Sequence, residues 1–183
     1  MSLADQLTLA RILAVPVVIV LFVADFDGHN WWATGFFIAA MTTDFFDGRV
    51  ARRYGYSSPL GSLLDPVADK VLVLTVLILL VGDDVFPGWM VALIVAREFL
   101  VSGLRLAALE RGVVMHARDL GKLKTWSQAT AAAIGGFAAA GAWDEQVAWW
   151  ALFVALLLTW VSGLDYARSA PRVLRGRPAV SPR

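Results

Sequence analysis

Long apolar runs, separated by short polar connections, limit what this chain can fold into more than any other feature. Hydrophobic residues make up 58% of the 183 positions and charged residues 17%, against roughly 25% charged in an average soluble domain. A chain this apolar cannot cover itself with polar surface, which excludes a single soluble globular domain and a disordered tail protein. The absence of cysteine excludes a disulfide scaffold and a Cys-based zinc site, and the net charge of +1 argues against a nucleic-acid binder.

Six of these runs are long enough to cross a bilayer, for which a helix needs about 20 mostly apolar residues. Their approximate ranges are 7–24, 31–53, 65–82, 88–110, 121–141 and 146–166. The runs lack the strict alternation of apolar and polar residues that barrel strands show, so helices are favoured. The sequence therefore predicts an all-α fold, an integral membrane bundle of six transmembrane helices.

Charge differs sharply between the two sets of connections. Those after the first, third and fifth spans contain no Lys or Arg but hold Asp25, Asp27, Asp83, Asp84, Asp144 and Glu145. All sixteen basic residues fall near the opposite ends of the spans. Because Lys and Arg concentrate on the cytoplasmic side of a membrane, both termini are predicted to be cytoplasmic. We expect residues 1–169 to form the membrane domain and residues 170–183, rich in Pro and Arg, to form a flexible basic tail.

Four aspartates lie inside the second and third spans, close to the predicted cytoplasmic ends. Ionisable residues within a span are costly and are candidates for function. Asp44 and Asp47 in the second span are spaced i, i+3. Asp65 and Asp69 in the third span are spaced i, i+4. At these spacings each pair lies on one face of its helix. The short turn at 54–61 predicts that the two pairs face each other.

Carboxylates this close together remain ionised only when cations lie between them. Oxygen ligands without Cys or His favour Mg²⁺, Mn²⁺ or Ca²⁺, and two such ions would neutralise four carboxylates. A structural role is the alternative for single residues. Asp65 precedes Pro66 and is compatible with a helix N-cap, and Asp44 with an ion pair to a nearby Arg. Neither alternative accounts for all four aspartates at these spacings.

Small and basic residues accompany the aspartates. Gly48 and Ala51 lie beside Asp47, where larger side chains would fill the space that a ligand needs. Arg52 lies one turn beyond Gly48 and can form a charge-assisted contact with phosphate. Metal ions, an arginine and a slot lined by small residues together predict a pyrophosphate site at the membrane surface.

These seven residues and Gly61 form one motif of eight positions, Asp44-x2-Asp47-Gly48-x2-Ala51-Arg52-x8-Gly61-x3-Asp65-x3-Asp69. It resembles the signature of the CDP-alcohol phosphotransferase family of membrane enzymes, whose six-span architecture fits the whole chain. The resemblance implies transfer of a phosphatidyl or phosphoalcohol group from a CDP-linked donor to an alcohol, with release of CMP. It also implies a homodimer, two Mg²⁺ or Mn²⁺ ions on the four aspartates, and Asp69 as the general base. The donor contacts that it implies are Thr8, Gly48, Ala51, Arg52, Ser58 and Gly61.

A second block, at 96–105, 110–114 and 121–125, is similar to the bacterial phosphatidylglycerophosphate synthase branch of that family. This similarity implies CDP-diacylglycerol as donor, sn-glycerol 3-phosphate as acceptor, and a place in phospholipid biosynthesis at the inner (cytoplasmic) membrane of a bacterium. Independently, a basic pocket beside a metal site suits an anionic acceptor. We interpret Glu98 as the partner of a neighbouring arginine. The candidates for the acceptor's phosphate are Arg105, Arg118, Lys122 and Lys124.

Two alternatives remain open from the sequence. The first keeps the chemistry and changes the acceptor to inositol phosphate, serine or phosphatidylglycerol, the last of which would give cardiolipin. The second is a divalent-cation transporter that uses the same aspartates. The transporter is less favoured, because all four aspartates lie near one membrane face and the first, fifth and sixth spans have no central carboxylate.

Overall fold

The fold is all-α, as predicted. The computed structural model describes residues 3–54, 59–110 and 119–175, and every regular element in these ranges is an α-helix. Each predicted span overlaps one of them: α1 (Leu3–Val23), α2 (His29–Tyr54), α3 (Pro59–Gly82), α4 (Gly88–Glu110), α5 (Asp119–Ala139) and α6 (Glu145–Arg175).

α6 reaches into the segment predicted as a tail. The tail was predicted to begin at residue 170, and the helix continues to Arg175. The boundary between the membrane domain and the tail stays a prediction. The remaining residues of the predicted tail, 176–183, lie outside the described part of the chain.

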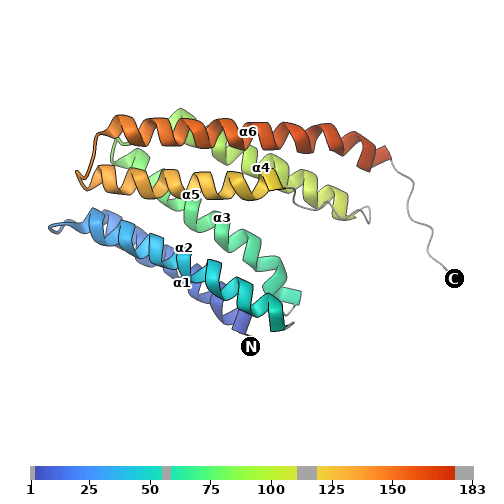
Figure 1. Ribbon diagram of the computed structural model, residues 1–183, viewed down its shortest axis with the longest axis horizontal. Coiled ribbons are helices and arrows are strands. Elements are labelled where there is room, and N and C mark those ends of the chain that lie inside the picture. The colour runs from blue at the N-terminus through green and yellow to red at the C-terminus, as the bar shows by residue number, and fades with distance from the viewer. Residues whose placement is uncertain (1–2, 55–58, 111–118, 176–183) are drawn as a thin grey trace.

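The helices run back and forth between two ends of the bundle (Figure 1). The short connections 24–28, 83–87 and 140–144 lie together at one end, which we call the loop end. The start of α1, the end of α2, the start of α3 and the end of α6 lie at the other. We call it the signature end, because the motif occupies the adjoining parts of α2 and α3. Both ends of the described chain thus lie on the same side of the bundle.

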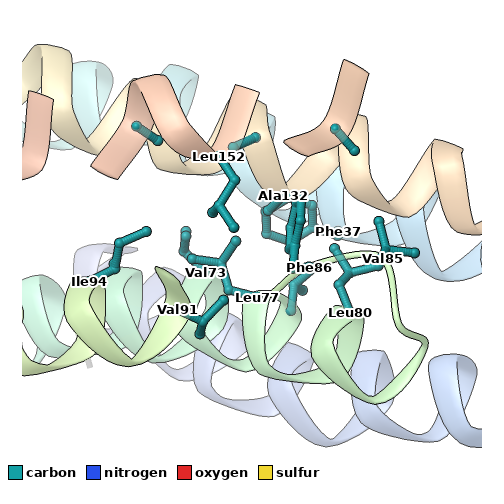
Figure 2. Close-up of a cluster of buried hydrophobic side chains, with 14 of the residues drawn as sticks. Phe37, Val73, Leu77, Leu80, Val85, Phe86, Val91, Ile94, Ala132 and Leu152 are labelled. Carbon is teal, nitrogen blue, oxygen red and sulfur yellow. The ribbon is translucent and has the colours of Figure 1, made fainter. Parts of the chain in front are cut away.

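Packing joins the six helices into one bundle. α1 contacts α2 and α3, while α5 packs along α6 and also contacts α2 and α3. α4 packs against α6 and contacts α3. The buried core between them includes Phe37, Leu77, Leu80, Phe86 and Leu152 (Figure 2). Small residues let α5 come close to its neighbours: a methyl group added at Gly136 would overlap the side chain of Thr34 in α2.

The outer surface of the bundle is apolar. On α6, large exposed side chains recur at intervals of three and four residues: Val147, Trp150, Val154, Leu157, Val161 and Leu164. Soluble monomers rarely expose a continuous apolar surface of this kind. Among the described residues, one segment of 20 residues, Glu145–Leu164, is long and apolar enough to cross a membrane.

The other helices have shorter apolar stretches. In α1 the apolar part is Leu9–Val23, and in α3 it is Lys70–Gly82. The half of α4 nearer the signature end is interrupted by Arg97, Glu98 and Arg105. The six helices are therefore confirmed, whereas the insertion of all six into a bilayer stays a prediction.

Candidate active site

The four signature aspartates lie on two helices that follow each other in the chain. Asp44 and Asp47 are in α2, which ends at Tyr54, and Asp65 and Asp69 are in α3, which begins at Pro59. The side chains of these four residues lie outside the described part of the structure. That the two pairs face each other therefore stays a prediction.

The backbone nevertheless sets the depth of each aspartate. At about 1.5 Å of rise per residue, Asp44 and Asp69 each lie about 15 Å from the adjoining ends of α2 and α3. Asp47 and Asp65 each lie about 10 Å from those ends. The four positions therefore lie at matching depths along α2 and α3. A divalent cation site at this level stays a prediction from the sequence.

Most of the other predicted site residues also lie on helices at the signature end. Thr8 is in α1; Gly48, Ala51 and Arg52 are in α2; Gly61 is in α3; and Lys122 is in α5. Their side chains are not described, and Ser58 and Arg118 lie outside the described residues altogether. Among the side chains that are described, no group of three or more His, Asp or Glu residues can hold a metal ion.

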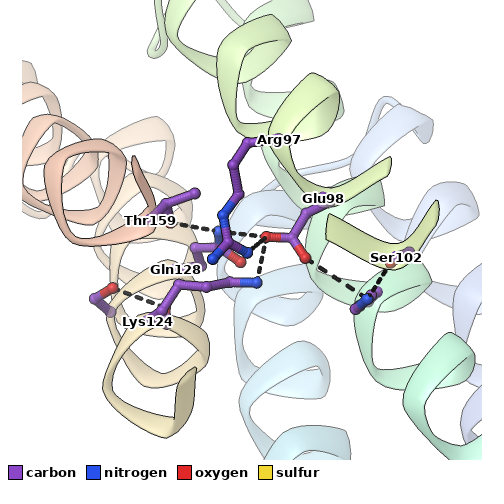
Figure 3. Close-up of polar contacts among 8 residues, drawn as sticks. Arg97, Glu98, Ser102, Lys124, Gln128 and Thr159 are labelled. Atoms are coloured by element: carbon purple, nitrogen blue, oxygen red, sulfur yellow. Dashed lines mark hydrogen bonds and ion pairs between the residues drawn. The ribbon is translucent and has the colours of Figure 1, made fainter. Parts of the chain in front are cut away.

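A buried carboxylate organises the described part of the signature end. Glu98 of α4 is only 3% exposed and forms an ion pair with Lys124 of α5 through Oε1. The same oxygen lies 3.2 Å from Nη1 of Arg97. The other carboxylate oxygen, Oε2, lies 3.8 Å from Nζ of Lys70 in α3. Figure 3 shows Lys124 reaching the carboxylate of Glu98 from a different helix, with Arg97 beside it.

Polar side chains complete this network. Nζ of Lys70 donates a hydrogen bond of 2.6 Å to Oγ of Ser102. Nε2 of Gln128 donates to Glu98 Oε1 at 3.3 Å and to Oγ1 of Thr159 in α6 at 2.8 Å. We call the set the Glu98 cluster, which joins α3, α4, α5 and α6: Lys70, Arg97, Glu98, Ser102, Lys124, Gln128 and Thr159.

Close helix packing holds Arg97 in this cluster. Gly163 of α6 lies against its side chain, and an added Cβ there would lie 2.9 Å from Nε of Arg97. The absence of a side chain on α6 at this level thus leaves room for the guanidinium. Within the described part of the cluster, the basic side chains of Lys70, Arg97 and Lys124 thus surround the carboxylate of Glu98.

The structure confirms one prediction for this region and adds residues that the sequence did not single out. Glu98 is the partner of a neighbouring arginine, as predicted. Arg105 is partly buried and lies within electrostatic range of Lys70. Lys70, Gln128 and Thr159 were not predicted as site residues. Two of them carry a recognisable signal, since Lys70 directly follows Asp69 at the start of an apolar run and Gln128 is the single amide side chain of α5.

Comparison with known proteins places the chain among membrane enzymes. The sequence model of the CDP-alcohol phosphatidyltransferase family matches residues 1–161. A Bacillus subtilis protein named CDP-diacylglycerol–glycerol-3-phosphate 3-phosphatidyltransferase is 39% identical, over 90% of this chain and 93% of its own length. A Rickettsia typhi protein of the same name is 38% identical, over 92% of this chain and 96% of its own.

A third relative, from Mycobacterium tuberculosis, is named a probable phosphatidylglycerophosphate synthase. It is 40% identical to this chain, over 96% of this chain and 84% of its own length. The match to the family covers the signature and the Glu98 cluster alike. The chain therefore belongs to the CDP-alcohol phosphatidyltransferase family.

Proposed function

We propose that this protein makes phosphatidylglycerophosphate in phospholipid biosynthesis. It transfers the phosphatidyl group of CDP-diacylglycerol to sn-glycerol 3-phosphate and releases CMP. The observation that carries this proposal is a sequence identity of 38–40%, over at least 90% of the chain, to relatives whose names state this activity. The positive charge around Glu98, at the same end as the signature, supports a phosphorylated acceptor.

The proposed setting is the inner membrane of a bacterium, which all six helices cross. The exposed apolar surface supports this placement, and the signature end faces the cytoplasm because the basic residues gather there. CDP-diacylglycerol would enter from the bilayer through its acyl chains, and the polar acceptor from the cytoplasm. We also propose that the enzyme is a homodimer, on the resemblance to the family alone.

The family is in general dependent on divalent metal ions. In this chain the ligands of two Mg²⁺ or Mn²⁺ ions would be Asp44, Asp47, Asp65 and Asp69. When bound, such ions neutralise negative charge on the pyrophosphate of the donor and on the departing CMP. The remaining donor contacts would come from Thr8, Gly48, Ala51, Arg52, Ser58 and Gly61.

In the proposed reaction, Asp69 acts as the general base. Its carboxylate takes the proton of the acceptor's primary hydroxyl, whose oxygen forms a bond to the phosphorus of the phosphatidyl group. The bond between that phosphorus and the CMP oxygen breaks, and CMP leaves with the electron pair. The attack is direct, so no covalent enzyme intermediate forms.

The phosphate of the acceptor would lie among the basic residues of α4 and the start of α5. Lys124 has three N–H donors, so its ion pair with Glu98 leaves donors for a second anion. The proposed phosphate contacts are Arg105, Arg118, Lys122 and Lys124.

The test is an assay with one acceptor at a time. Purified protein in detergent receives CDP-diacylglycerol and Mg²⁺ or Mn²⁺, and CMP release is measured with glycerol 3-phosphate, inositol phosphate, serine or phosphatidylglycerol. We expect CMP with glycerol 3-phosphate. Release with another acceptor only would replace the proposed acceptor, and no release with any acceptor, together with cation flux in liposomes, would favour a transporter.

A further inference from the structure

One carboxylate holds two lysines that belong to different parts of the proposed site. Lys70 directly follows Asp69, the proposed base, and lies 3.8 Å from Glu98. Lys124, a candidate for the acceptor's phosphate, forms an ion pair with the other oxygen of Glu98. Glu98 itself is buried on α4 and contacts each lysine across a pair of helices.

Such anchoring matters because a lysine side chain is long and flexible. Its ammonium group samples many positions, and ordering it costs side-chain entropy. In this structure both lysines are ordered before any ligand binds. Lys70 is held by Glu98 and Ser102, and Lys124 is held by Glu98. A ligand that meets ammonium groups already in place binds more tightly than one that must order them.

Glu98 also reduces the electrostatic repulsion between the basic side chains around it. Lys70 lies within electrostatic range of Arg97 and Arg105, and Lys124 within range of Arg97 and Lys70. Without the carboxylate these cations would repel one another and separate. With it, one negative charge keeps several positive charges close together.

We propose that Glu98 is a positioning residue for the acceptor: its carboxylate fixes the ammonium groups of Lys70 and Lys124 so that the phosphate of the acceptor is held beside Asp69. This inference rests on the proposed function. It adds Lys70 to the acceptor site and gives Glu98 a role that requires its charge, without contact between Glu98 and the reacting atoms.

The experiment compares KM for each substrate in variants of Glu98. Glu98→Gln keeps the size of the side chain and removes its charge, so both lysines lose their anchor. We expect the KM for glycerol 3-phosphate to rise at least tenfold, while the KM for CDP-diacylglycerol stays within twofold of wild type. Glu98→Asp keeps the charge on a shorter side chain, and we expect it to recover part of the loss.

A control removes a contact outside the Glu98 cluster. Asn30→Ala deletes the donor of the 3.1 Å hydrogen bond to the backbone oxygen of Ala139 at the loop end and leaves the carboxylate and both lysines in place. We expect a lower Tm with both KM values unchanged. If Glu98→Gln behaves in the same way as Asn30→Ala, the role of Glu98 is only structural and the inference is wrong.

A second variant and a binding measurement cover the case in which Glu98→Gln does not fold. Ser102→Ala removes the hydrogen-bond acceptor of Lys70, and we expect a smaller rise, about threefold, in the KM for glycerol 3-phosphate alone. We also expect glycerol 3-phosphate to raise the Tm of the wild-type protein more than that of Ser102→Ala. An unchanged acceptor KM in Ser102→Ala would overturn the inference about Lys70.

The two proposals can fail separately. If the wild-type protein does not release CMP with glycerol 3-phosphate, the proposed function fails before any variant is compared. If the wild-type protein is active and the acceptor KM of the Glu98 variants does not change, the proposed function stands and only the positioning role is lost.

Discussion

The two ends of the bundle are held together by different kinds of contact. At the loop end, the ring of Phe137 lies 5.2 Å from that of Trp31 and 5.7 Å from that of Trp143, measured between centroids. Phe86 packs against the backbone of Gly135 in the same region. At the signature end, the described contacts are ion pairs and hydrogen bonds around Glu98 (Figure 3).

The residues that stabilise the fold by packing and the residues proposed to act on substrates thus lie at opposite ends of the bundle. In the proposed membrane setting, helices gain little from burying apolar surface against each other, so close packing of small and aromatic residues has to supply stability. The loop end has that packing. The signature end instead carries charges that would be costly in a membrane, and the proposed function gives them a role in holding substrates. Changes at the loop end should therefore alter stability, and changes at the signature end should alter kinetics.

Loss of the proposed base gives the largest expected effect. Asp69→Asn keeps the shape of the side chain but cannot accept the proton of the acceptor, so we expect turnover to fall by about 10²–10⁴-fold. CMP release measures the loss, and Tm should stay close to wild type. Near-normal turnover would remove Asp69 as base. Asp83→Asn is a matched control at the loop end and should leave turnover unchanged.

Gly136→Ala tests the loop end. The added methyl group overlaps Thr34, and overpacking of this kind costs about 1–3 kcal/mol of stability. We expect a clear fall in Tm, with both KM values of the folded protein unchanged. Gly35→Ala is the control, since an added Cβ at Gly35 meets no atom within 4 Å. A change in KM for Gly136→Ala would show that the two ends are not independent.

Lys122→Ala sharpens the comparison at the signature end. Loss of one phosphate contact should raise the KM for glycerol 3-phosphate about tenfold, which equals about 1.4 kcal/mol. The KM for CDP-diacylglycerol and the Tm should not change, and Lys122→Arg should keep most of the affinity because it keeps the charge. If the KM for glycerol 3-phosphate is unaltered, Lys122 interacts with the membrane surface and does not bind the acceptor.

The smallest expected effect concerns pH at the loop end. Partial burial, with Asp84 close by, raises the pKa of the Asp83 carboxyl above its ordinary value of 3.8, and the nearby His29 opposes part of this rise. The native state thus holds the proton more tightly than the unfolded state, so stability falls as pH rises from 3.8 through the native pKa. Asp83→Asn should raise Tm slightly at pH 7 and not below pH 3.8. A lower Tm at pH 7 would contradict this prediction.

The helices could be predicted from the sequence because the apolar runs are long and the connections between them are short. The end of α6 could not, because Pro171 and the arginines of its last turns are compatible with either a helix or a tail. The motif likewise gives the positions of Asp44 and Asp69 on α2 and α3 without any knowledge of the fold.

The partners of Glu98 were harder to predict, because they depend on how each helix is rotated about its axis. The contact with Arg97 joins neighbours in sequence and was predicted. The contacts with Gln128 and Lys70 join residues on different helices. No local pattern fixes such pairs, since they follow from the packing of α3, α4 and α5 as a whole.

The glycine on α6 opposite Arg97 has a consequence for how closely that helix can approach α4. A Cβ at position 163 would lie 2.9 Å from Nε of Arg97, so a larger residue there would have to displace either α6 or the guanidinium. The same position thus sets both the spacing of these two helices and the place of the charge next to Glu98.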